Sequence, residues 1–469
     1  MSSDSNQATS RGQWSSSFGF IMAAAGSAVG LGNLWKFPFL VGQNGGSAFL
    51  IVYALFVVFI GLSLVIAEIT IGKYGQLNPI GSYNLISPKL KWVGTMGILT
   101  GFIILAYYPV VGGWILYYLC NAFQKATPGI NCAQMFDNYT SSYLPLITLC
   151  IYSILNYVIV ALGVEKGIEK YSKIMMPSLF IILLIILIRT VTLDKGWEGI
   201  NFLLKPDFSK LTGKVLLDAV GQVFFSLSLG MGALMTYGSY MKKEENLLVA
   251  ATSIPAIDTA IAFFAAVSIM PAVFAFGFEP TAGPKLIFVT LPAVFAQMPW
   301  GNFIAVIFFT LMLFAAITSS ISMTEGLVSY LIDKRHWRRF TATTTVCFTC
   351  LLMGIPTALS FGPMKNILFF GKSIFDALDF LASNILLPCG GIMLCISVGW
   401  IWDGGLRNLT KVQKTEDGTE IISNSYVFNA PLKEITNNGK LNFPFMEAWI
   451  FLIKWICPLV IAIIFLYNL

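Results

Sequence analysis

The chain has 469 residues, of which 56% are hydrophobic and only 11% are charged. Such a composition supplies too little polar surface to cover a water-soluble globule of this size, so it excludes a soluble globular protein. The net charge of +6 is typical of membrane proteins with basic cytoplasmic loops and requires no nucleic-acid partner. We therefore expect an all-α polytopic membrane protein.

The segment before the first apolar run, residues 1–13, is expected to form a short cytoplasmic tail. Its opening residues, MSSDSNQATS, lack the basic and apolar regions of a secretory signal peptide. Apolar runs long enough to cross about 30 Å of hydrocarbon then recur along the chain. They predict about eleven transmembrane helices, with approximate bounds 18–38, 47–71, 92–123, 145–163, 171–191, 215–239, 249–277, 302–332, 340–356, 374–402 and 446–467.

Small and polar residues interrupt the first and sixth of these runs near their midpoints. The stretch GSAVGLGN begins at Gly26, and SLSLGMGA begins at Ser226. Ordinary helix packing through small residues would also account for such a pattern. The spacing of five spans favours an inverted 5+5 repeat, 14–191 and 215–402, in which each half begins with a discontinuous helix. A helical core over 14–402 would then be followed by a cytoplasmic loop, 403–445, and an eleventh helix, 446–469.

A helix that breaks inside the bilayer leaves amide and carbonyl groups without partners, at a cost of several kcal/mol for each group. Amides at the new helix N-terminus attract a carboxylate, whereas free carbonyl groups coordinate a small cation such as Na+. Two facing breaks therefore predict a site for a zwitterion together with coupling ions.

The loops richest in lysine and arginine predict the orientation. The loops that contain Lys89, Lys170, Lys243 and Arg338 fall on the same side as the amino terminus, whereas one basic loop, 195–214, falls on the other side. This asymmetry predicts a cytoplasmic amino terminus, and the odd number of spans then places the carboxyl terminus outside. The eight cysteines lie mainly in apolar runs and are interpreted as free thiols.

Seven segments, spread over nearly the whole chain, carry a family resemblance: AGSAVGLGNLWKFP, NGGSAF, AEITIGKYG, AYYPVVGGW, VGQVFFSLSLGMGA, FAAITSSIS and LDF. Through them the chain resembles the neurotransmitter:sodium symporter family, and is most similar in pattern to its bacterial amino-acid transporters. The resemblance implies a multi-pass symporter of the bacterial inner membrane. Such a protein would use sodium to import a hydrophobic or aromatic L-amino acid by alternating access.

The resemblance also implies two sodium sites built from hard oxygen donors. The first would use the carbonyl groups of Gly26, Val29 and Ala315 and the hydroxyl groups of Thr318 and Ser319. The second would use the Ala28 carbonyl group, Asn33, Ser226 and Asp258, together with the carboxylate of the substrate.

Asp258 is a lone acid in an apolar helix, and such a residue marks a functional site by default, with a packing role as the alternative. Tyr53, Gln222 and Ser226 match three positions of the chloride site in chloride-dependent relatives, but Ala262 replaces a hydroxyl in the seventh span. We therefore expect Asp258 to supply the negative charge and chloride to be unnecessary. A further hypothesis is that Asp258 takes up a proton on the empty return step.

Glycine at position 30 implies an amino-acid substrate, because aminergic relatives place an aspartate there. The groups expected to bind the substrate carboxylate are the amides near Gly30 and Gly32 and the hydroxyl group of Tyr108. Those expected to face its ammonium group are the carbonyl groups of Ala28, Phe225 and Ser226, with Thr318. Those expected to contact its side chain are Ile104, Phe225, Ser228, Met231, Ser319 and Met323. This mainly apolar wall favours hydrophobic cargo, and Met231 is flexible enough to fit cargoes of different size.

Charged residues also match the family's two gates. The outer pair would be Lys36 and Asp379, and the inner pair Arg11 and Asp333, with Trp14 packed below. Lysine in place of the usual arginine loses a two-pronged contact, which predicts a looser outer gate. The alternative for Lys36 is a snorkelling anchor at the end of the first span. Glu68 is expected to support the unwound part of the sixth span.

Other functions are weighed against the symporter. A channel would need a continuous polar path, whereas the polar residues here cluster near mid-membrane. An intramembrane enzyme is disfavoured because HExxH and GxSxG motifs are absent from the sequence. An amino-acid sensor or scaffold on a transporter fold, or a symporter for another small zwitterion, stays open, as does a homodimer.

Overall fold

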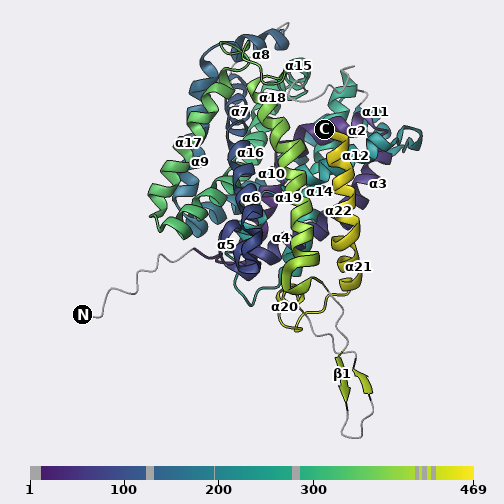
Figure 1. Ribbon diagram of the computed structural model, residues 1–469. Helices are drawn as coiled ribbons and strands as arrows, with labels where there is room; N and C mark the ends of the chain where they lie inside the picture. The colour runs from purple at the N-terminus through teal and green to yellow at the C-terminus, as the bar shows by residue number, and fades with distance from the viewer. Residues whose placement is uncertain are drawn as a thin grey trace.

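The computed structural model describes residues 12–122, 131–194, 196–276, 286–406, 411–414, 420–423 and 429–468. These residues form a body of long helices that run side by side (Figure 1). Strands β1 (Lys411–Lys414) and β2 (Glu420–Ser423) pair in antiparallel fashion, with Lys411 opposite Ser423. The all-α fold expected from the composition is confirmed.

Nine stretches of the described residues are long and apolar enough to cross a membrane, and each coincides with an expected span. In chain order their elements are α3 (Ser47–Phe56), η2 (Val57–Gly61) and α4 (Leu62–Gly75); η3 (Pro88–Leu90), α6 (Lys91–Leu105) and α7 (Tyr108–Ala122); α9 (Leu144–Ala161); η4 (Val164–Glu169) and α10 (Lys170–Val191); α14 (Leu247–Ala275); α16 (Gly301–Arg335); α17 (Arg339–Leu359); α18 (Ile374–Phe380), η7 (Leu381–Leu386), α19 (Leu387–Ile396), η8 (Ser397–Ile401) and η9 (Trp402–Gly404); and α21 (Met446–Phe451), η10 (Leu452–Ile456) and α22 (Cys457–Asn468).

The first and sixth spans are both discontinuous, as the sequence predicts. The first consists of α1 (Ser17–Ala28), η1 (Gly32–Lys36) and α2 (Phe37–Gln43), and its two halves are bent by 57°. The sixth consists of α12 (Gly213–Ser226) and α13 (Ala233–Gly238), with residues 227–232 between them. Gly230 and Gly232 there have φ angles of 85° and 78°, which glycine adopts without a steric penalty.

The broken helices lie at the centre of the bundle, and lipid-facing side chains surround it. Helix α1 packs against α10, α14 and α16 and buries almost all of its residues. On the outer helices, large apolar side chains such as Ile151, Phe348 and Leu459 are exposed instead. This distribution suits a bilayer, because apolar side chains face hydrocarbon while the buried polar groups find partners inside the bundle.

Shorter elements connect the spans: α5 (Pro79–Ile86), α8 (Cys132–Thr140), α11 (Gly196–Leu204), η5 (Phe208–Lys210), η6 (Leu286–Thr290), α15 (Leu291–Gln297) and α20 (Ala430–Ile435). Helix α20 lies inside the expected loop, 403–445, where the sequence analysis identified no structured element. In Figure 1 the C-terminal end of α22 lies at the end of the bundle that carries α8 and α15, whereas α5 and α20 lie at the other end. The last span therefore begins at the end that carries α20 and finishes at the opposite end. Most of the expected tail, residues 1–11, lies outside the described residues.

Candidate functional site

The breaks in the two discontinuous spans face each other across one small cavity. The Ser228 hydroxyl group donates to the carbonyl oxygen of Ser27 over 3.1 Å, and Gln222 Nε2 donates to that of Gly32 over 3.2 Å. The first bond gives a partner to a carbonyl group at the end of α1, whereas the Gly32 carbonyl group also accepts from the amide of Phe37, so Gln222 is its second donor. The residues that line the cavity are Ala28, Gly30, Leu31, Gly32, Asn33, Ile104, Tyr107, Tyr108, Phe225, Ser226, Ser228, Met231, Ser319, Met323 and Leu387.

A buried carboxylate lies at one side of this cavity. Asp258 of α14 is fully buried, and its two oxygens accept hydrogen bonds from Asn33 Nδ2 and from the Ser226 hydroxyl group, each over 2.7 Å. Asn33 Oδ1 in turn accepts from the amide of Gly30 over 3.1 Å. No lysine or arginine forms an ion pair with Asp258 in the described part of the chain. A buried carboxylate without a protein cation is suited to a bound metal cation.

The structure thus brings together three members of the expected second sodium site, Asn33, Ser226 and Asp258, and Ala28 lines the same cavity. Tyr53 is also buried next to this carboxylate. The charge of Asp258 and these neutral oxygens form a donor set that fits Na+.

The members of the expected first sodium site lie where α1 ends against α16. The Ser319 hydroxyl oxygen is 3.5 Å from the carbonyl oxygen of Gly26, 3.2 Å from that of Val29 and 3.1 Å from that of Ala315. The Thr318 hydroxyl oxygen is 3.1 Å from the same Ala315 oxygen. Three carbonyl oxygens thus surround the Ser319 hydroxyl group, and the Thr318 hydroxyl group lies beside one of them. A cation at this place would have hard oxygen donors from both α16 and the end of α1.

The cavity is lined by most of the residues that we expected to contact a substrate. One expected residue is absent from its lining, and three further residues are present. Thr318 does not line it, and its hydroxyl group lies within hydrogen-bond distance of the carbonyl groups of Phe314 and Ala315 in its own helix. Leu31, Tyr107 and Leu387 were missed by the sequence analysis. Leu387 comes from the tenth span, and no local sequence pattern indicates that this helix reaches the cavity.

The Tyr108 hydroxyl group is buried and makes no hydrogen bond of good geometry, although Ser319 and the backbone of Leu31 lie beside it. It faces Gly30, where an added Cβ atom would lie 3.3 Å from this hydroxyl group and 2.8 Å from Ser319 Oγ. An unsatisfied buried donor costs free energy, so a bound anion or carboxylate would be favoured there. The absence of a side chain at position 30 leaves room for such a group.

Glu68 of α4 lies against the unwound part of the sixth span. It is buried, and its Oε2 atom accepts a hydrogen bond from the amide of Gly230 over 3.4 Å. This contact satisfies a backbone donor that no longer belongs to a helix, which is the supporting role expected from the sequence.

The expected outer gate pair is not in contact. The ammonium group of Lys36 lies 5.0 Å from the centroid of the Phe225 ring, and no ion pair joins it to Asp379, although both residues are described. Asp379 instead accepts a hydrogen bond from the Ser383 hydroxyl group over 3.0 Å. The lysine thus makes a cation–π contact with Phe225, and because Phe225 lines the cavity, the Lys36 side chain lies over that wall of the cavity.

Near the C-terminal end of α13, Trp14 is buried and its indole donates to the carbonyl oxygen of Tyr237 over 2.9 Å. Asp333 accepts hydrogen bonds from the amide and the side chain of Asn78, over 2.7 and 2.9 Å. Its expected partner, Arg11, lies outside the described residues.

Sequence reasoning missed a second polar cluster at this end. Glu325 of α16 is fully buried and forms an ion pair with Arg339, and the Tyr240 hydroxyl group donates to the same carboxylate over 2.5 Å. A glutamate within the eighth apolar span was the available signal, because a carboxylate in such a helix requires a partner.

Comparison with known proteins explains this arrangement. The family model described as the sodium:neurotransmitter symporter family matches residues 11–144 and 141–417. The chain belongs to this family. Its resemblance to the family, inferred above from seven segments, is therefore confirmed, and the protein is a sodium-dependent symporter that crosses the membrane many times.

Individual relatives agree with the family assignment. An uncharacterized sodium-dependent transporter of Bacillus subtilis, YhdH, is 37% identical over 460 residues, which are 97% of each chain. The sodium- and chloride-dependent taurine transporter of Rattus norvegicus is 28% identical, over 84% of this chain and 72% of its own. The crystal structure of MhsT in complex with L-phenylalanine has a TM-score of 0.84 and 39% identity, and the match covers 98% of this chain and all of that one. The symporter fold, with its two discontinuous helices, is thus shown.

Proposed function

We propose that this symporter imports a hydrophobic or aromatic L-amino acid together with Na+. The cavity between the two breaks carries the proposal, because a carboxylate-binding end and an apolar wall meet within it. The unpaired Tyr108 hydroxyl group and the open space at Gly30 suit the substrate carboxylate. Ile104, Met231 and Met323 line the same cavity and supply apolar surface for the side chain of the substrate.

The two expected ion sites explain how sodium would act on the substrate. A cation beside Asp258 would also lie beside the substrate carboxylate, because Asn33 bonds to both Asp258 and the amide of Gly30. The bound cation would increase the affinity for the substrate, and by linkage the bound substrate would increase the affinity for the cation by the same factor. The ion near Ser319 would join α1 to α16 and hold the first break in its bound conformation.

The phenylalanine complex of MhsT supports the choice of an aromatic cargo, since the two chains are 39% identical. The direct test is uptake of labelled phenylalanine into proteoliposomes that contain the purified protein. We expect accumulation against a concentration gradient when sodium is outside, and none when potassium replaces it. Competition by all twenty amino acids would rank the cargoes, and displacement only by small polar zwitterions would overturn the apolar assignment.

We also propose that transport does not require chloride, because the Asp258 carboxylate already supplies a buried negative charge beside the cation. Replacing chloride by gluconate on both sides of the proteoliposome membrane is expected to leave the initial uptake rate unchanged within about twofold. A loss of most of the uptake in gluconate would contradict the proposal. Replacing sodium in the same preparation should abolish uptake, which shows that the proteoliposomes report coupled transport.

The variant Tyr108→Phe is expected to weaken amino-acid binding by about 10- to 100-fold, because a hydrogen bond to a charged group contributes about 1.5–3 kcal/mol. The affinity for Na+ measured without substrate should not change. Tyr118→Phe is the matched control, since it removes another buried, unpaired hydroxyl group that does not line the cavity. Isothermal titration of both variants with phenylalanine in sodium buffer measures the difference.

Finally, we propose that the amino terminus and α20 face the cytoplasm, in agreement with the charge of the loops at that end. Lys73, Lys89, Lys243 and Arg338 all lie in or beside these loops.

A further inference from the structure

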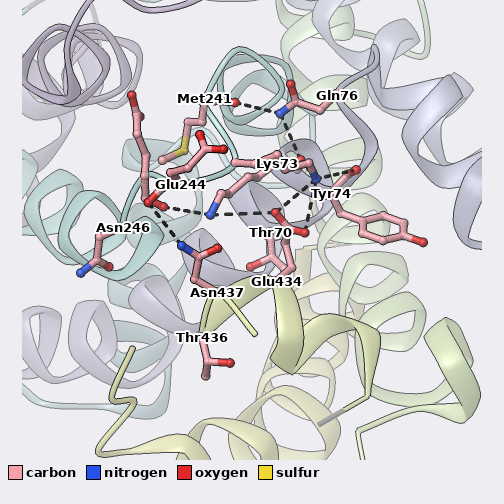
Figure 2. Close-up of polar contacts among 12 residues, drawn as sticks. Thr70, Lys73, Tyr74, Gln76, Met241, Glu244, Asn246, Glu434, Thr436 and Asn437 are labelled. Carbon is pink, nitrogen blue, oxygen red and sulfur yellow. Dashed lines mark hydrogen bonds and ion pairs between the residues drawn. The ribbon is translucent and has the colours of Figure 1, made fainter. Parts of the chain in front are cut away.

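Three segments that are far apart in the sequence meet at the end of the molecule that carries α5. They are the end of α4, the α13–α14 loop (residues 239–246) and the short helix α20 with Asn437 behind it. Figure 2 shows Lys73, Glu244, Glu434 and Asn437 of these segments close together. None of these contacts takes part in the binding cavity described above.

Lys73, at the end of α4, is the centre of this cluster. Its side chain is fully buried, and its ammonium group donates to the carbonyl oxygen of Glu245 over 2.9 Å. Glu434 Oε1 of α20 lies 3.9 Å from the same ammonium group. A buried ammonium group requires such partners, because its removal from water is costly.

Lys243, in the α13–α14 loop, connects the same three segments. Its ammonium group donates to the carbonyl oxygen of Lys73 over 2.7 Å and to that of Tyr74 over 3.1 Å. It also lies 3.3 Å from both carboxylate oxygens of Glu434. Glu434 therefore faces two lysines, one from α4 and one from the loop.

Further contacts seat α20 against the bundle. Leu432 and Ile435 are buried, and Asn437 Nδ2 donates to the carbonyl oxygen of Glu244 over 3.3 Å. At the other end of the helix, the amide of Ala430 donates to Asp403 Oδ2 over 2.9 Å. Helix α20 thus connects the end of the tenth span to the α13–α14 loop.

The two segments that α20 holds lead directly to the binding site. Helix α4 carries Glu68, which accepts from the amide of Gly230 in the sixth-span break. The α13–α14 loop follows α13, the inner half of that broken span. A displacement of either segment would therefore reach the cavity through short, packed elements.

Helix α20 is short, and one side of its contact with the lysines is open to solvent. The helix has six residues, and its carboxylate meets the lysines at 3.3–3.9 Å. If α20 moved away, water would reach Lys73 and replace Glu434 as its partner. The Lys243 side chain is 47% exposed, and an ion pair at such a site contributes little to stability, so this part of the contact can open and close during a transport cycle.

We propose that α20 is a strap whose Glu434 holds α4 and the α13–α14 loop in the inward-closed conformation, and that its release accompanies opening toward the cytoplasm. This inference rests on the proposed alternating-access function. It assigns a role in the conformational equilibrium to a helix that touches neither the ions nor the substrate.

The test is hydrogen–deuterium exchange of the full-length protein in nanodiscs with saturating sodium. In Glu434→Gln, the amides of residues 239–246 and 12–22 are expected to exchange about fivefold faster than in the parent, which corresponds to a coupling of about 1 kcal/mol. Lys243→Met should act in the same direction. The double variant should give less than the sum of the two single effects, since both substitutions remove the Lys243–Glu434 ion pair.

Lys433→Gln is the matched control, because Lys433 lies on the same helix and is exposed. Equal exchange in Glu434→Gln and the parent, or an equal rise in Lys433→Gln, would overturn the strap. Sodium-dependent binding of phenylalanine, measured in the same samples, tests the proposed function separately. If the parent did not bind phenylalanine, the proposed substrate would be wrong. If the parent bound phenylalanine normally but hydrogen exchange was unchanged in Glu434→Gln, only the strap proposal would be wrong.

Discussion

Asp258→Asn is expected to reduce the affinity for Na+ by about 100-fold or more and to abolish sodium-driven uptake. Asparagine keeps the size of the side chain and can still bond to Asn33 and Ser226, but it removes the negative charge. Because the site is fully buried, that charge interacts with a bound cation with little screening. Loss of one partner from a buried charge pair costs about 3–5 kcal/mol, which accounts for the expected factor.

The measurement is phenylalanine binding as a function of sodium concentration. Asp376→Asn is the control, since this carboxylate is exposed at the start of α18 and bonds only to the nearby Ser373 in the described structure. If Asp258→Asn bound sodium with the affinity of the parent, the Asp258 carboxylate would not be a ligand of the ion. Addition of chloride to the variant provides a second measurement: partial recovery of binding is expected if a missing negative charge, rather than a misplaced side chain, causes the defect.

Gly30→Ala is expected to lower substrate affinity by at least 100-fold while the protein remains folded in the membrane. The added methyl group would lie 2.8 Å from Ser319 Oγ and 3.3 Å from the Tyr108 hydroxyl group. It would occupy the space proposed for the substrate carboxylate and displace a hydroxyl group of the expected first sodium site. Overpacking of a buried site costs about 1–3 kcal/mol before the lost ligand contacts are added.

Gly101→Ala is the matched control for this substitution, because a Cβ atom at position 101 would meet no atom within 4 Å. Phenylalanine binding in sodium buffer and thermal unfolding in detergent should be measured for both variants. We expect Gly101→Ala to match the parent in both. Full substrate affinity in Gly30→Ala would show that the substrate carboxylate does not bind at the first break.

The sequence predicted the transmembrane spans and the two breaks well, because both depend on local properties. Apolar length determines whether a segment can cross the bilayer, and the glycines near positions 30 and 230 determine where a helix can stop. The identity of Asp258 as a special residue was equally local, since one carboxylate in an apolar run is visible without a partner.

The partners of these residues depended on packing. Asn33 and Asp258 are 225 residues apart, and only the arrangement of η1 against α14 shows that they share a hydrogen bond. The position of Lys36 over Phe225, rather than beside Asp379, likewise follows from how one flexible side chain fits the space above the cavity.

The sequence by itself therefore determined that this protein spans a membrane with two interrupted helices and a buried acid. Only the tertiary structure decided which further groups meet: Leu387 with the other residues of the cavity, Glu325 with Arg339, and α20 with Lys73. The physical reason is that helix formation and membrane insertion are set by short stretches of sequence, whereas contacts across the bundle depend on how all the helices pack at once.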